Sequence, residues 1–78
     1  MAARRYKTAG FAVCLRNGEY KAGLEVRKLY PVLHDADAEA EGFIRVVDES
    51  GDDYLYPAEF FERVSLPLSL ERTLRRAS

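Results

Sequence analysis

The chain has 78 residues, of which 47% are hydrophobic, 32% are charged and 12% are aromatic, and its formal net charge is −1. This length allows one domain with one small core, and the composition excludes a disordered segment. The small net charge excludes a strong general attraction to nucleic acid or acidic membranes, and no stretch approaches the roughly 18 apolar residues of a spanning helix. We therefore expect a soluble, cytoplasmic protein with no membrane contact.

The first ten residues, 1–10, contain three basic side chains and little apolar content. These side chains are Arg4, Arg5 and Lys7. Such a segment predicts a flexible, solvated terminus, with a basic arm that contacts phosphate as the alternative.

Residues 11–15, FAVCL, alternate as a half-buried strand does, with Phe11, Val13 and Leu15 on one side. Cys14 lies on the other side and is the only cysteine, so it cannot form an internal disulfide. A cysteine in the middle of a strand is typical of a small packed residue and not of a reactive thiol.

An Asn-Gly pair at residues 17–18 is a strong turn signal. Residues 20–23 then either pair back as a hairpin or belong to a long irregular loop, and we favour the loop. Beyond this loop, Leu24 and Val26 are two positions apart, and Tyr30 and Val32 repeat that spacing. This spacing predicts that the four side chains face inward. Pro31 interrupts this pattern because it has no backbone donor, which predicts an open edge or a bulge.

Residues 34–41, HDADAEAE, are polar and predict a solvated loop or a loose helical turn. Their acidic residues do not have the spacing of a calcium-binding loop, and the single histidine, His34, cannot form a zinc site without cysteine partners. A lone histidine beside Asp35 also lacks the nucleophile and the orienting group that catalysis requires. We therefore predict no metal, no cofactor and no enzyme activity.

Residues 42–48 are the clearest strand in the chain, because β-branched residues dominate it. We expect it to be central in a sheet, with Ile44 and Val46 facing the core. Phe43 is out of phase with these two residues and should therefore point outward.

Residues 48–64, DESGDDYLYPAEFFERV, predict a turn, an aromatic strand, a helical turn and a last strand. Ser50 and Gly51 supply the turn. Pro57 ends the strand because it has no backbone donor, and its fixed φ suits the first position of a helical turn. Within that turn Phe60 and Phe61 point in different directions, so only one of them can enter the core.

Residues 66–78 predict a short amphipathic helix, with Ser69 as a candidate N-cap and Leu70 and Leu74 four positions apart. A minimal barrel does not include such a helix. It is therefore a packed appendage, a partner-binding helix or a frayed tail.

The segment LYPAEFFERV resembles the end of a Src-homology-3 domain, where a proline precedes a one-turn helix with an aromatic residue and a short last strand follows. The order and spacing of the predicted strands and turns extend this resemblance over residues 24–64. The segment IRVVDESGDDYLYP also resembles segments of short bacterial proteins of uncharacterised role. The Src-homology-3 resemblance implies an all-β fold: a five-stranded, strongly bent antiparallel small barrel over residues 11–65, with a helical appendage or tail at residues 66–78.

Src-homology-3 domains that bind proline-rich peptides use a tryptophan that opens the third strand, the proline before the helical turn and the aromatic residue within that turn. The matching positions here are Phe43, Pro57 and Phe60. The chain has no tryptophan, and FAVCL replaces the tyrosine-rich motif of the first strand, so recognition of a PxxP ligand does not follow.

We expect a non-enzymatic binding module with a protein partner, because the chain carries aromatic residues beside a proline-marked edge and no catalytic signature. The predicted contact patch consists of Phe43, Tyr54, Pro57 and Phe60, with an acidic rim at Asp52, Asp53 and Glu59. The alternative is a nucleic-acid-binding small barrel whose two basic ends share one face, through Arg4, Arg5, Lys7, Arg72, Arg75 and Arg76.

Overall fold

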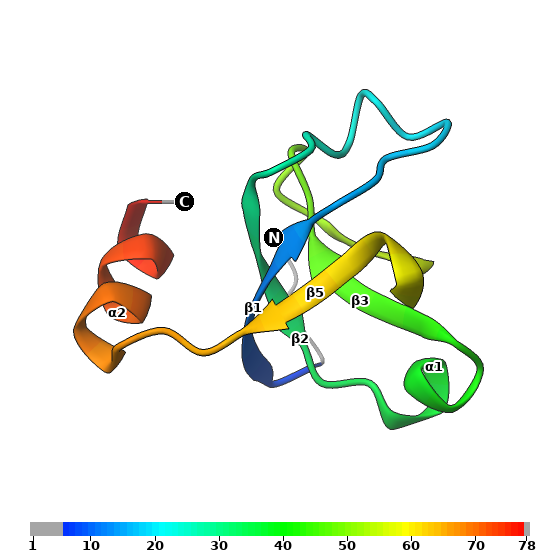
Figure 1. Cartoon of the computed structure of the whole chain (residues 1–78). Helices are drawn as coiled ribbons and strands as arrows, with labels where there is room; N and C mark the ends of the chain where they lie inside the picture. The colour runs from blue at the N-terminus through cyan, green and yellow to red at the C-terminus, as the bar shows by residue number, and fades with distance from the viewer. Residues whose placement is uncertain (1–5, 78) are drawn as a thin grey trace.

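A computed structural model describes residues 6–77 and shows five antiparallel strands in one sheet, with two short helices (Figure 1). In chain order the elements are β1 (Thr8–Cys14), β2 (Leu29–Leu33), α1 (Ala36–Ala40), β3 (Phe43–Val47), β4 (Asp53–Pro57), the one-turn 3-10 helix η1 (Ala58–Phe60), β5 (Phe61–Val64) and α2 (Leu68–Ala77). The mainly β fold and the one-turn helix before the last strand are confirmed. The strand order is β4-β3-β2-β1-β5, so the sheet is open with β4 and β5 at its edges, and a closed barrel is not confirmed.

The core lies on one face of this sheet and contains aromatic and aliphatic residues from all five strands. It consists of Ala12, Cys14, Leu24, Tyr30, Val32, Ile44, Val46, Tyr56 and Phe61. The inward orientation of Ile44 and Val46 is confirmed, since both side chains are buried. Of the two adjacent phenylalanines, Phe61 is buried and Phe60 is only half-buried, as the geometry of a single turn requires.

Strand β1 differs from its predicted phase. It begins at Thr8, within the segment predicted to be flexible, and its core-facing residues are Ala12 and Cys14. Leu15 is 49% exposed, but Phe11 is buried on the opposite face, where the guanidinium of Arg75 lies 5.6 Å from the centre of its ring. Both faces of β1 are covered, the inner face by the core and the outer face at Phe11 by α2, so alternation could not show which row faces the core.

The segment between β1 and β2 is a long loop without strands, as favoured from the sequence. Leu24 is buried, but Val26 is 39% exposed, so its predicted inward orientation is wrong. The reason is that β2 starts only at Leu29, and the period of two does not apply to irregular backbone.

Pro31 lies in β2, which is an interior strand, so the predicted open edge is wrong and the bulge is the alternative that fits. The β1–β2 register shifts between Thr8 and Phe11, and Pro31 is the partner of Phe11. On the other side, the β2–β3 ladder pairs only Val32 and Leu33. The missing N–H of Pro31 is thus placed where the ladder is irregular.

Helix α1 corresponds to the polar segment predicted as a loop or a helical turn. Its N-cap is Asp35, whose carboxylate accepts a hydrogen bond of 3.1 Å from the backbone N–H of Ala38. Arg45 of β3 donates to Asp35 at 2.8 Å and to Asp53 of β4 at 2.9 Å, and it lies 4.2 Å from the ring centre of Tyr6. This arginine therefore holds α1, β3 and β4 together. Neither helix among residues 6–77 has the length and apolar character that crossing a bilayer requires.

Candidate functional site

The structure brings together two of the four residues of the predicted contact patch. Phe43 of β3 is the cross-strand partner of Pro57 of β4, and its side chain is 41% exposed. Directly opposed residues in an antiparallel pair point to the same face, so Phe43 and Pro57 share the outer face of the β3–β4 hairpin. The outward orientation of Phe43 is confirmed.

The other two predicted residues lie elsewhere. Tyr54 is paired with Val46 and therefore belongs to the inner row of β4, although 52% of it is exposed beside the turn. The ring of Phe60 packs against the core and lies 6.2 Å from the ring of Tyr20 in the long loop. A Cβ atom at Gly18 would be only 3.0 Å from this ring, so the loop backbone closes over Phe60.

Leu55 joins Phe43 and Pro57 on the outer face and was missed from the sequence. It is the cross-strand partner of Arg45, it lies between the positions of Asp53 and Pro57 in the outer row, and it is 43% exposed. We call the group Phe43, Leu55 and Pro57 the β4 edge surface. The signal that could have found Leu55 is its spacing of two from Pro57, which places both side chains on one face of a strand.

The backbone of β4 has a free side. The backbone N–H of Asp48 donates to the carbonyl of Asp52 at 3.1 Å, and the backbone N–H of Ala58 donates to the carbonyl of Gly42 at 3.0 Å. Hydrogen-bonded and non-hydrogen-bonded pairs alternate along an antiparallel ladder, so the backbone groups of Tyr54 and Tyr56 face β3. Those of Leu55 and Pro57 face away from it, and within residues 6–77 no strand pairs with that side of β4.

Carboxylates that have no ion-pair partner among residues 6–77 flank the β4 edge surface. Asp52 precedes β4, Glu59 follows it in η1, and Glu41 precedes the Gly42 backbone that pairs with Ala58. All three residues are exposed. Asp53, which was predicted as part of the rim, instead forms an ion pair with Arg45. This pair neutralises the guanidinium of Arg45.

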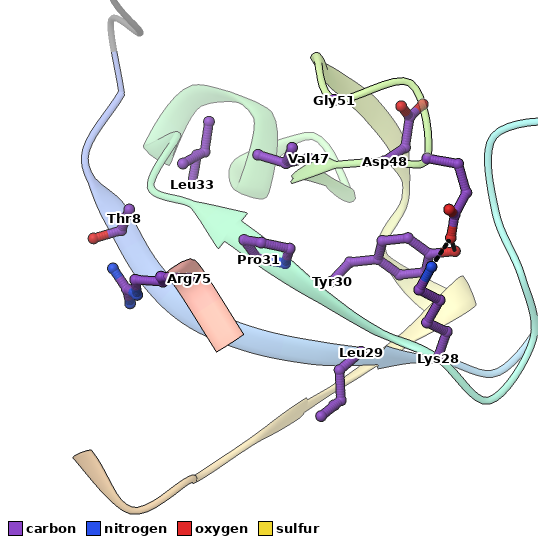
Figure 2. Close-up of a pocket in the computed structure, with 11 residues that line it drawn as sticks. Thr8, Lys28, Leu29, Tyr30, Pro31, Leu33, Val47, Asp48, Gly51 and Arg75 are labelled. Atoms are coloured by element: carbon purple, nitrogen blue, oxygen red, sulfur yellow. Dashed lines mark hydrogen bonds and ion pairs between the residues drawn. The ribbon is translucent and has the colours of Figure 1, made fainter. Parts of the chain in front are cut away.

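A separate hollow of about 560 Å³ lies on the outer face of β2 and is bordered by α2 (Figure 2). Its apolar lining includes Leu29, Pro31, Leu33 and Val47. The charged groups around it already have partners: the Lys28 Nζ atom is 2.7 Å from Glu49 Oε2, and Arg75 pairs with Glu71 at 3.0 Å. This hollow therefore presents an apolar surface without an uncommitted charge to orient a small polar ligand.

Two tyrosine hydroxyls form hydrogen bonds to the turn that follows β3. Tyr56 donates to Asp48 at 2.5 Å, and Tyr30 donates to Glu49 at 2.5 Å. Asp48 also accepts from the backbone N–H of Ser50 at 2.9 Å and from its hydroxyl at 2.6 Å. Burial raises the pKa of the Asp48 carboxyl, but these hydrogen bonds outweigh burial and hold the pKa below its ordinary value.

The same tyrosines have raised pKa values, first because burial disfavours the phenolate and second because a carboxylate accepts each hydroxyl proton. Both hydroxyls therefore stay protonated at neutral pH and act as donors. Gly23 permits this arrangement, since a Cβ atom there would be 2.7 Å from the Tyr56 hydroxyl and 3.0 Å from an oxygen of Asp48. The network fixes the turn and offers no free group for a reaction.

The reactive side chains of the described residues are dispersed. Burial raises the pKa of the Cys14 thiol, which lies in the core and donates to the carbonyl of Arg16 at 3.1 Å. His34 is exposed, and its imidazole is 4.0 Å from Glu39. Within residues 6–77 no group of three or more histidine, cysteine or acidic residues has a geometry that could hold a metal ion.

The start of β1 and the last turn of α2 border the same hollow. Thr8, which follows Lys7, lines the same hollow as Arg75, and Figure 2 shows these two labelled residues side by side. Arg72 and Arg76 are exposed on α2. The predicted contacts Arg4 and Arg5 lie outside the described residues.

A scan against protein-family models and searches of curated proteins and solved structures found no match to the chain.

Proposed function

We propose that this protein is a non-enzymatic binding module, a strongly bent Src-homology-3-like small barrel, that contacts a protein partner through the β4 edge surface. The observation that carries the proposal is the exposure of Phe43 and Leu55 on one face beside the unpaired edge of β4. Apolar side chains grouped in this way on a soluble domain usually mark a contact site. The order of the strands and the one-turn helix before β5 support the barrel-like description.

A protein partner fits this surface better than a small molecule does. The β4 edge surface lies along a strand and is not enclosed, whereas small-molecule sites are concave and bury most of the ligand. Its chemistry combines apolar side chains with peripheral carboxylates, which matches the apolar centre and polar rim of protein interfaces.

The double substitution Phe43→Ala with Leu55→Ala should lower affinity for the partner by at least about tenfold, because it removes both large exposed side chains of the surface. It should cost less stability than Ile44→Ala, since neither side chain belongs to the core. The measurement is capture of partner proteins from the native cell extract by immobilised wild type and variant, followed by affinity determination with the recovered partner.

The matched control is Leu15→Ala with Leu68→Ala, which removes two side chains that are 49% and 62% exposed outside the β4 edge surface. This control should retain the partner. Retention of the partner by Phe43→Ala with Leu55→Ala, or equal loss with the control, would contradict the assignment of the site.

A second candidate function is nucleic-acid binding, and the observation in its favour is that Thr8, which follows Lys7, and Arg75 of α2 line the same hollow. If this function is correct, affinity for duplex DNA must fall with added salt, with a slope near 0.9 per phosphate neutralised. Arg72→Ala with Arg76→Ala should then reduce the slope by about 2, while Lys21→Ala in the long loop should leave it unchanged. Absence of binding at low salt in a mobility-shift assay removes this candidate, as does a captured complex that survives nuclease treatment.

A further inference from the structure

The two edges of the sheet differ in how well they are protected. The edge strand β5 carries two exposed charged residues, Glu62 and Arg63, and charges on an edge discourage pairing with another chain. The edge strand β4 has the sequence DYLYP, and its middle residues Tyr54 and Leu55 are uncharged and about half exposed. Only β4 therefore presents an edge that an extended chain can approach without displacing charged side chains.

We infer that the protein partner contributes an extended segment that adds to β4 as a further strand, with apolar residues at its centre and basic residues at its ends. This inference rests on the proposed protein-binding function and specifies the kind of partner. Addition of a strand to an exposed edge combines backbone hydrogen bonds, which give affinity, with side-chain contacts at alternate positions, which give specificity.

The backbone positions define the register of this pairing. Leu55 directs its N–H and its C=O away from β3, and Pro57 directs only a C=O, because proline has no N–H. An incoming residue opposite Leu55 can therefore exchange two hydrogen bonds with it, and the incoming residue two positions along can donate to the carbonyl of Pro57. The ladder is short, so side-chain contacts must contribute the rest of the affinity.

Side chains on both faces of β4 can receive the alternating residues of the incoming segment. Leu55 and Phe43 lie on the outer face, and Tyr54 lies on the inner row and is 52% exposed. An extended segment that runs along β4 places successive side chains against these two rows in turn. Apolar residues at its central positions match both rows.

The ends of the segment meet negative charge. Asp52 lies before β4 and Glu59 lies after it, and both are exposed. The arginine of the neighbouring strand, Arg45, is engaged by Asp35 and Asp53 and does not offset these carboxylates. Lysine or arginine at the ends of the segment therefore complements the edge, whereas acidic residues there oppose like charges.

The test uses synthetic peptides of alternating valine and threonine, with lysine at both ends in one peptide and glutamate at both ends in the other. The lysine peptide should bind the full chain at least about tenfold more tightly in titrations followed by NMR, and the Leu55 amide should be among the most shifted signals. A lysine peptide that is N-methylated at alternate positions cannot donate to β4 and should lose at least about tenfold in affinity. Reversing the edge charge by Asp52→Lys with Glu59→Lys should remove the preference for the lysine peptide.

A matched pair of variants separates the contribution of the backbone hydrogen bonds to peptide affinity from the contribution of the Leu55 side chain. Leu55→Ala keeps the outward N–H, and Leu55→Pro removes it, while neither change touches a bond to β3. The proline variant should bind the lysine peptide at least about tenfold more weakly than the alanine variant. Should Leu55→Pro fail to fold, the N-methylated peptide tests the reciprocal bonds of the same ladder, those that the peptide donates to the carbonyls of β4, on the unchanged protein.

Each outcome decides the inference separately from the proposed function. Equal affinities for the N-methylated and unmethylated peptides, or no binding of the lysine peptide even at millimolar concentration, would overturn strand addition. The protein-binding proposal would then stand or fall on the capture experiment with Phe43→Ala and Leu55→Ala. Concentration-dependent dimers that Leu55→Pro abolishes would show a second copy at this edge and would overturn the basic partner segment.

Discussion

Ile44→Ala should lower the free energy of unfolding by roughly 2 to 5 kcal/mol, which is a large share of the stability of a domain of this size. Ile44 is only 3% exposed and belongs to the core cluster, where its cross-strand partner is the buried Tyr56. Truncation removes buried methyl groups and leaves a cavity between strands that cannot close it without moving the sheet.

Urea denaturation followed by circular dichroism measures this effect, because the midpoint should fall while the slope stays constant. Leu55→Ala on the adjacent strand is the matched control, since Leu55 is 43% exposed and its truncation should change stability by about 0.5 kcal/mol or less. A loss of only a few tenths of a kcal/mol for Ile44→Ala would contradict the placement of this residue in the core.

Asp48→Ala should destabilise the fold by about 2 to 4 kcal/mol, because it removes a buried charged acceptor and leaves its donors without a partner. The carboxylate of Asp48 is the acceptor for the Tyr56 hydroxyl, for the Ser50 hydroxyl and for the Ser50 backbone. Tyr56 is 5% exposed, so water does not readily replace the lost acceptor.

Unfolding of Asp48→Ala, Tyr56→Phe and the double variant forms a cycle that isolates the hydrogen bond between the two side chains. The double variant should be more stable than the sum of the single losses predicts, because Phe leaves no hydroxyl to satisfy. Strict additivity would show that the two side chains do not interact.

The Asp48 carboxyl also gives stability a dependence on pH. Its pKa in the folded state is lowered below the ordinary value of 3.8, so its contribution is fully present above that value and is lost as the pH falls through the folded-state pKa. The wild type should therefore lose stability as the pH falls below about 4, and Asp48→Asn should lose less over the same interval. An equal acid dependence in both proteins would assign the effect to other carboxyl groups.

The elements that local sequence determines were predictable. Strand β3 is rich in β-branched residues, and the order of Pro57, Phe60 and Phe61 is enough to place a one-turn helix before the last strand. These features depend on a few consecutive residues. The same holds for the outward orientation of Phe43, which follows from the period of two within a single strand.

The features that depend on distant residues were not predictable from the pattern. Phe11 is buried because α2 returns to β1 from the other end of the chain, and Pro31 lies inside the sheet because β1 and β3 pair with the two sides of β2. The role of Asp48 depends on Tyr56 and on the close approach of Gly23 from the long loop. For the candidate site, Leu55 was missed because alternation assigns faces within a strand but does not show which strand lies at the edge of the sheet.

The pairing of β1 with β5 determines when the sheet can be completed during synthesis. Phe11 is the partner of Val64 and Cys14 is the partner of Phe61, so β1 cannot complete its pairing until β5 has been synthesised. The β3–β4 hairpin can form as it emerges, since its partners are close in sequence, but the β1–β5 contacts close the chain between Phe11 and Val64 into one long loop. A nascent chain that ends before residue 61 lacks both β5 and the aromatic ring that completes the core, and it exposes β1 as an open edge to chaperones and to neighbouring chains.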